Sequence, residues 1–84
     1  MTRQEKMIAR FCRQPADFTW EELVRLLRAL GYQEVPTGKT GGSRRRFVHE
    51  AAGIISLHKP HPKNVVKQYV MAQVHQQLNE EGLL

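Results

Sequence analysis

The stretch that decides the fold is RRRFVHEAAGIISLH, residues 44–58. Apolar residues are interleaved with polar ones toward both of its ends, which is typical of strands that are buried on one face. The four residues between the two ends, 50–53, close with a glycine, and so short a connection forms an antiparallel hairpin. The sequence therefore predicts paired strands at 44–49 and 54–58.

The alternation of side chains along a strand sorts this hairpin into two faces. We expect Phe47, Ile55 and Leu57 to lie on the face that packs against helices. Arg45 and His49 share the face of Phe47 by the same alternation. The opposite face then stays open, and it carries these polar side chains: Arg44, Arg46, Ser56 and His58.

A helix is predicted at residues 19–30, ahead of the hairpin. Thr19 stands three residues before Glu22, which is the spacing of a capping box, and Gly31 follows as a stop signal. Between them, apolar residues recur at helical spacing: Trp20, Leu23, Val24, Leu27 and Leu30. We expect this stripe to form part of the core.

A last helix is predicted after the hairpin, from Asn64, which we interpret as its N-cap, to about Glu80. Gly82 ends it, and the two leucines that follow are expected to fold back onto the core. The expected apolar stripe of this helix consists of Val66, Tyr69, Val70, Val74 and Leu78.

A short helix is also expected at 3–13 and a short strand at 32–35. The predicted fold class is α+β, with a three-stranded antiparallel sheet packed on helices. Its order, α-β-β-β-α, is that of double-stranded-RNA-binding domains, with an extra N-terminal helix. We accordingly divide the chain into an N-terminal helical extension, residues 1–18, and a domain at 19–84.

Positive charge is concentrated in the second half of the chain. Residues 35–79 hold seven Lys and Arg residues and one acidic residue, a net of +6, whereas residues 1–34 carry a net of +1. Such a surplus favours a polyanionic partner, most commonly RNA or DNA. DNA ranks below RNA because no helix shows basic and amide side chains on one recognition face. A membrane surface fits less well, because no basic helix has a broad apolar face.

Size and composition exclude several other classes. The 84 residues are enough for one modest core, and no apolar run approaches the ~20 residues that span a bilayer. The single cysteine, Cys12, excludes a disulfide framework and a Cys-based zinc site, and we expect no cofactor and no metal. Residues 1–13 lack the apolar centre of a signal peptide, so a cytoplasmic protein is expected.

Several short motifs follow one another in a fixed order along residues 19–84. They are Glu22-Leu23 through Leu30-Gly31-Tyr32, Gly42-Ser43, Phe47-Val48-His49, Ile55-Ser56-Leu57-His58, Pro60-His61-Pro62 and Glu81-Gly82-Leu83-Leu84. In this order and spacing they resemble the HicA family of bacterial toxin–antitoxin systems.

The resemblance implies a small, metal-independent RNA endonuclease, an mRNA interferase, that halts translation and is neutralised by a HicB-type antitoxin. In that family the catalytic histidine stands one or two residues past the Gly-Ser. Arg44 and Arg45 occupy those positions here. An arginine guanidinium stays protonated and cannot take a proton from a ribose hydroxyl, so the family mechanism does not carry over at this place.

Three interpretations stay open. Cleavage persists with a relocated histidine, His58 first because it shares the open face with the arginines, and His61 second because the prolines around it project it outward. Alternatively, the arginines alone stabilise the developing charge of a slow reaction. In the third interpretation, the protein is a noncatalytic module that binds RNA or docks the antitoxin.

The expected partners are mRNA and the HicB-type antitoxin. His49 and His75 are set aside, since one lies on the expected core face and the other on a helix beside glutamines. The residues expected to contact RNA are Lys39, Ser43, Arg44, Arg45, Arg46, Lys59 and Lys63.

Overall fold

The structure, a computed structural model, describes residues 2–35 and 44–84. These residues form, in chain order, α1 (Arg3–Cys12), α2 (Trp20–Ala29), β1 (Gln33–Val35), β2 (Arg44–His49), β3 (Gly53–His58) and α3 (Gln68–Glu80). The three strands make one antiparallel sheet in the order β1-β2-β3. The predicted α+β fold, with its extra N-terminal helix, is confirmed.

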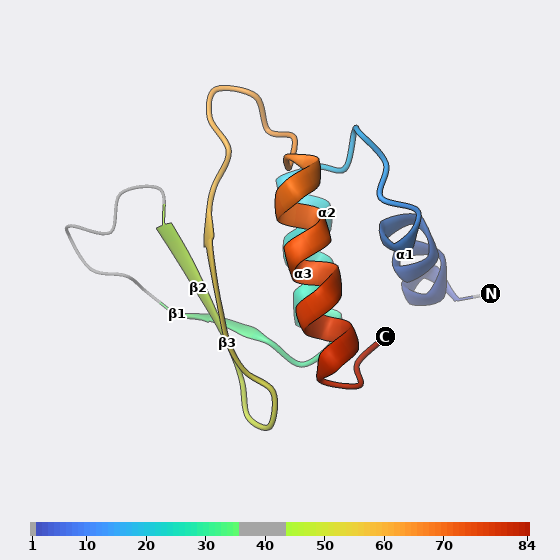
Figure 1. The fold of residues 1–84 in the computed structure, drawn as a ribbon, viewed down its shortest axis with the longest axis vertical. Helices are drawn as coiled ribbons and strands as arrows, with labels where there is room; N and C mark the ends of the chain where they lie inside the picture. The colour runs from blue at the N-terminus through green and yellow to red at the C-terminus, as the bar shows by residue number, and fades with distance from the viewer. Residues whose placement is uncertain (1, 36–43) are drawn as a thin grey trace.

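The elements stack in three layers (Figure 1). The sheet forms the first layer, α2 and α3 cover one of its faces, and α1 lies beyond them on the side away from the sheet. The other face of the sheet is covered by none of the three helices.

The register of the hairpin confirms the predicted sorting of side chains. Phe47 pairs with Ile55, and both are buried, as is Leu57 two residues further along β3. Arg44 and Arg46 lie on the other face, and both are exposed. Because a slip of one residue would exchange the two faces, burial of the apolar side chains fixes where the arginines point.

Capping interactions fix both ends of α2. The Thr19 hydroxyl accepts a hydrogen bond from the Glu22 amide at 3.2 Å, and the Glu22 carboxylate accepts one from the Thr19 amide at 3.0 Å. At the other end Gly31 has φ +103°, and the Tyr32 amide donates to the Leu27 carbonyl. This is the Schellman arrangement that a glycine at this position allows. The predicted limits of this helix are confirmed.

The last helix starts three residues later than predicted, with Lys67 and not Asn64 as its N-cap. Residues 64–66 instead run antiparallel to residues 18–20, with a bridge between Thr19 and Val65. The Asn64 carbonyl accepts a hydrogen bond from the Trp20 amide, which lies in the first turn of α2 and has no acceptor within its own helix. This tertiary bond outweighs the local preference of Asn64 for an N-cap.

The later start also corrects the apolar stripe of α3. Tyr69 was predicted on it but is 63% exposed, and Met71 is buried in its place beside Val74 and Leu78. Val66 is buried as predicted, although it lies outside the helix. At the C-terminal end Gly82 takes φ +74°, and the two final leucines pack against the core as expected.

The core extends from the sheet through α2 and α3 to α1. Phe11 of α1 is fully buried and packs against Phe18, with ring centroids 5.5 Å apart. The buried apolar residues form one cluster: Phe11, Phe18, Trp20, Leu23, Leu26, Leu27, Tyr32, Phe47, Ala52, Ile55, Leu57, Val66, Met71, Val74 and Leu78. The N-terminal helix therefore packs on the same core as the rest of the chain.

Candidate nucleic-acid interface

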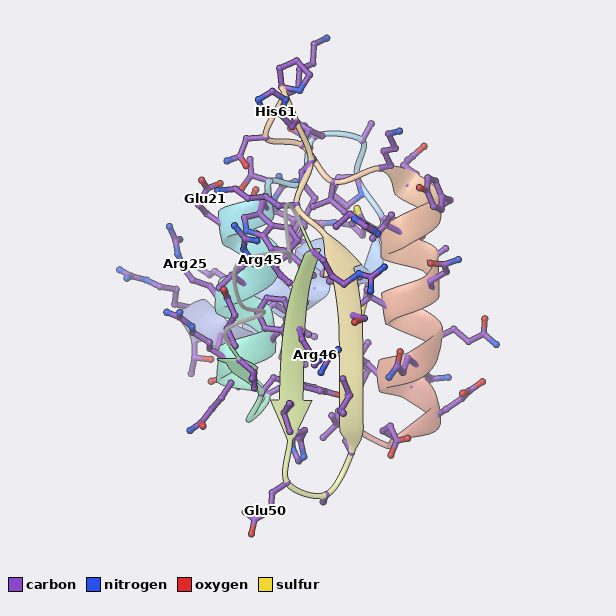
Figure 2. All side chains as sticks on the ribbon, turned by 90° about the vertical axis from the view of Figure 1, so that its left-hand side faces the viewer. Glu21, Arg25, Arg45, Arg46, Glu50 and His61 are labelled. Atoms are coloured by element: carbon purple, nitrogen blue, oxygen red, sulfur yellow. The ribbon has the colours of Figure 1, made fainter. Side chains whose placement is uncertain are left out.

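The open sheet face gathers four of the predicted polar side chains in two cross-strand pairs. Arg44 of β2 lies opposite His58 of β3, and Arg46 lies opposite Ser56. All four residues are exposed. Figure 2 looks onto this face, with Arg46 near its centre and Glu50 at the tip of the hairpin. The open face thus carries two guanidinium groups on the central strand, β2, and an imidazole on the edge strand, β3.

The pairing of Arg44 with His58 places an acid–base group beside a permanent cation. Side chains directly opposite on antiparallel strands have Cβ atoms about 5 Å apart. A phosphate that is bound by the guanidinium of Arg44 therefore lies within reach of the His58 imidazole. Such an arrangement suits proton transfer next to a phosphodiester, since neutral histidine accepts a proton near pH 7.

Arg45 takes a different position from its two neighbours. It pairs with Leu57, so its side chain lies on the face that the helices cover. Its Nε is 3.7 Å from a carboxylate oxygen of Glu34, and its Nη1 donates to the Arg44 carbonyl at 3.0 Å. In Figure 2 it lies on the α2 side of the sheet, as Arg25 does. Of the three consecutive arginines, two therefore lie on the open face, and one lies on the helix-covered face beside Glu34.

The segment after β3 carries the remaining described candidates. Lys59, His61 and Lys63 are all exposed, and for His61 this agrees with the outward position predicted from the prolines around it. His61 lies at the far end of the molecule from the hairpin tip, well away from Arg46 (Figure 2). The structure therefore brings His58, but not His61, next to the open-face arginines. Lys39 and Ser43, the other predicted contacts, lie outside the described residues.

A pocket of about 860 Å³ opens between the end of β3, the segment after it and the first turns of α3. His58 and Ser56 line it from the sheet, and His61 lines it from the loop. Lys67 and Tyr69 line it from α3, and neither was predicted as a site residue. Tyr69 was missed because a helix starting at Asn64 placed it in the core.

His49 and His75 each make contacts with neighbouring residues of the fold. The His49 Nδ1 accepts hydrogen bonds from the amides of Ala51 and Ala52, both at 3.0 Å, and so fixes the hairpin turn. The same ring packs edge-on against Tyr32, with centroids 5.0 Å apart. His75 lies beside Phe11, with centroids 6.0 Å apart.

The described part of the chain contains neither a metal-binding cluster nor a helix that could span a membrane. Residues 2–35 and 44–84 contain no group of three or more His, Cys, Asp or Glu side chains that are placed to hold a metal ion. Within the same ranges, no helix has the length and apolar character needed to cross a membrane.

The sequence matches a known protein family. A family model described as the HicA toxin of bacterial toxin–antitoxin systems matches residues 20–79. No curated protein and no solved structure gave a match. The matched range is well over half of the chain and runs from the first residue of α2 to the last turn of α3. The chain therefore belongs to the HicA family of toxins from bacterial toxin–antitoxin systems.

Proposed function

We propose that this toxin binds single-stranded RNA across the open sheet face and cleaves it with His58 as the general base. The observation that carries the proposal is the direct cross-strand pairing of Arg44 with His58 on an exposed face. The three strands contain one acidic residue, Glu34, and its carboxylate lies beside Arg45 on the other face. The open face therefore attracts a polyanion without local opposition.

The proposed reaction is transesterification at a phosphodiester. The neutral imidazole of His58 takes the proton from the ribose 2′-hydroxyl, and the 2′-oxygen bonds to phosphorus. The bond from phosphorus to the 5′-oxygen breaks, and that oxygen takes a proton from water. Arg44 and Arg46 stabilise the negative charge that builds on the phosphoryl oxygens. The products are a 2′,3′-cyclic phosphate and a free 5′-hydroxyl.

A second candidate function is RNA binding without cleavage. Arginine residues at positions 44 and 45, where the family has its catalytic histidine, favour this alternative. The same open face and the same arginines serve both functions, so binding data cannot separate them. Only the presence or absence of cleaved product distinguishes the two.

The antitoxin partner is proposed to be of the HicB type. It neutralises the toxin by covering the open face with acidic side chains, which compete directly with RNA for Arg44 and Arg46. This assignment places the protein in the cytoplasm, where both mRNA and the antitoxin are present.

RNA binding is tested by removing the two open-face charges together. The variant Arg44→Gln/Arg46→Gln should bind an unstructured RNA more weakly, and the slope of log affinity against log salt should fall by about 1.4, since each lost phosphate contact removes about 0.7. The matched control is Arg25→Gln/Arg28→Gln, which removes the same charge from exposed positions on α2. Equal losses of RNA affinity in the two variants would mean that net charge alone, and not these two positions, determines binding.

Cleavage is tested with His58→Ala. The variant should lose activity by about 10²- to 10⁴-fold with little change in RNA affinity, and a 2′-methoxy substrate should survive intact. His61→Ala is the comparison, because both histidines are exposed and line one pocket. A larger loss of cleavage activity in His61→Ala would mean that His61 and not His58 is the general base. An absence of cyclic-phosphate product from the wild-type protein would leave the binding module as the function.

The antitoxin proposal is tested with the purified toxin–antitoxin complex. The complex should bind RNA at least tenfold more weakly than the free toxin, and Arg44→Gln/Arg46→Gln should weaken its association with the antitoxin. If the complex binds RNA as tightly as the free toxin does, the antitoxin contacts another surface.

A further inference from the structure

The pocket beside α3 is lined by a set of residues that the reaction proposed above leaves largely unused. It is bounded on one side by β3 and on the other by the first turns of α3, with the segment 59–63 across its end. None of the described residues that line it is acidic. Three of them are lysines, at positions 59, 63 and 67, and all three are exposed. The pocket therefore combines an open concave shape with a purely positive rim.

Tyr69 is the aromatic side chain of this pocket. It is 63% exposed, and no described residue hydrogen-bonds its hydroxyl. A tyrosine in the second position of a helix normally buries much of its ring when the helix packs on a core, but here Val70 and Met71 take the core-facing positions. Its ring is thus available to a ligand, and the backbone of a 13-residue helix holds it in place.

Apolar and amide groups complete the pocket. Val65 and Val70 supply apolar surface, and Gln68 and Gln73 supply side-chain amides that can both donate and accept hydrogen bonds. A flat, polar heterocycle needs this combination: an aromatic face for stacking, apolar surface around it and amide groups for its edge. The lysines at the rim match the phosphates on either side of such a base.

We propose that this pocket binds one unstacked base of single-stranded RNA, with Tyr69 as the stacking platform and Lys63 and Lys67 on the flanking phosphates. The inference rests on the proposed RNA binding of the open face and names the form of RNA that is bound. It excludes a fully paired duplex as the preferred ligand, because a base within a helix cannot turn into a pocket.

The pocket is continuous with the open face. Ser56 and His58 belong to both, since they lie on the open face of β3 and also line the pocket. An RNA strand held by Arg44 and Arg46 therefore reaches the pocket by passing around the edge of β3. A base that is anchored on Tyr69 fixes the adjacent ribose and phosphate near His58, which sets the bond that is cut. Tyr69 is thus a specificity-determining residue.

The test is the affinity of three variants for an unstructured RNA of about 10 nucleotides, measured by fluorescence anisotropy. Tyr69→Ala should weaken binding by about 5- to 150-fold with an unchanged salt slope, because stacking neutralises no phosphate. Tyr69→Phe should bind like the wild type. Lys63→Gln/Lys67→Gln should lower both the affinity and the salt slope.

A blunt-ended RNA duplex serves as the matched ligand. Tyr69→Ala should leave duplex affinity unchanged, since no base is free to stack. If Tyr69→Ala loses as much affinity for the duplex as for the single strand, the single-strand assignment is overturned. If Tyr69→Phe loses as much affinity as Tyr69→Ala does, the hydroxyl and not ring stacking makes the contact. If Tyr69→Ala weakens association with the antitoxin and not with RNA, the pocket holds a protein segment and the inference fails.

Failure of this inference and failure of the proposed function give different results. Wild-type affinity in Tyr69→Ala, together with weak binding by Arg44→Gln/Arg46→Gln, overturns the pocket assignment and keeps the open face as the RNA site. An absence of RNA binding by the wild type overturns both.

Discussion

Arg10 of α1 binds Glu22 of α2 through two parallel hydrogen bonds, from Nε to Oε2 at 3.0 Å and from Nη2 to Oε1 at 3.2 Å. The same guanidinium lies 3.3 Å from Asp17 and stacks over Phe18, with 5.4 Å between Cζ and the ring centroid. Glu22 also completes the capping box of α2. A helix outside the family match is therefore tied to the capping box of the first helix inside it.

The Arg10–Glu22 pair makes stability depend on pH. Hydrogen bonding by Arg10 and by Thr19 lowers the pKa of Glu22 below its ordinary value of 4.5. The folded carboxylate stays ionised where the unfolded one takes up a proton, so the contribution is complete above about pH 5 and is lost as pH falls through the folded pKa. Glu22→Gln should cost ~1–2 kcal/mol at pH 7 and progressively less as pH falls through the folded pKa of Glu22, by urea unfolding at each pH. Glu50→Gln, at the exposed hairpin tip, is the matched control for the loss of one carboxylate.

Phe11 should contribute to the stability of the whole domain. Phe11→Ala removes a fully buried ring that contacts Phe18, so it should lower the free energy of unfolding by ~3–5 kcal/mol. Unfolding followed by circular dichroism and by Trp20 fluorescence should remain one transition, since Trp20 belongs to the same core cluster. Ile8→Ala, at a partly buried position, is the milder comparison. Near-native stability of Phe11→Ala would make α1 a dispensable extension.

Gly31 lies against the ring of His49. A Cβ at position 31 would be 2.8 Å from His49 Nε2, whereas a Cβ at Gly53 meets open space, although both glycines have positive φ. Gly53→Ala should therefore lower the free energy of unfolding by ~1–2 kcal/mol, from the strain of an alanine at positive φ. Gly31→Ala should lower it by ~1–2 kcal/mol more, because of the clash with His49. In a His49→Ala background the two costs should become equal in thermal unfolding. A persistent excess at Gly31 would point to a different clash.

Arg44→His should give the family's histidine back to the open face. Arg44 is exposed and opposite His58, so an imidazole there adds a second acid–base group while Arg46 still binds the phosphate, and cleavage should rise at least tenfold. Arg45→His puts the same side chain on the helix-covered face and removes the ion pair with Glu34, so it should bring no gain. Single-turnover cleavage of labelled RNA measures both. A gain in Arg45→His alone would mean that the strand presents its other face to RNA.

The sheet and α2 could be predicted because local signals and burial agree there. Alternation in residues 44–58 places Phe47, Ile55 and Leu57 inside, and a single register satisfies all three. The capping box and the glycine stop mark both ends of α2 without help from the rest of the chain. These features depend on residues within about a dozen positions of one another, which a sequence displays directly.

The start of α3 and the pocket could not be predicted, because they depend on distant contacts. Asn64 has the side chain of an N-cap, yet its carbonyl serves Trp20, which is 44 positions earlier in the chain. Its side-chain amide in turn donates to the carboxylate of Glu21. Once the helix starts at Gln68, Tyr69 turns outward and lines the pocket with His58. One misplaced boundary therefore hid the aromatic residue of the candidate site.

The bridge between Thr19 and Val65 has a consequence for amide hydrogen exchange. The Val66 amide donates to the Phe18 carbonyl at 2.8 Å, and the Trp20 amide donates to the Asn64 carbonyl at 3.0 Å. These two bonds close the base of the segment that carries His61, while residues 59–63 project beyond it. Fluctuations of the loop therefore leave both amide protons protected, and each proton exchanges only when residues 18–20 separate from residues 64–66. A ligand that slows exchange at these amides stabilises the whole fold, whereas one that acts on the loop alone leaves them unchanged.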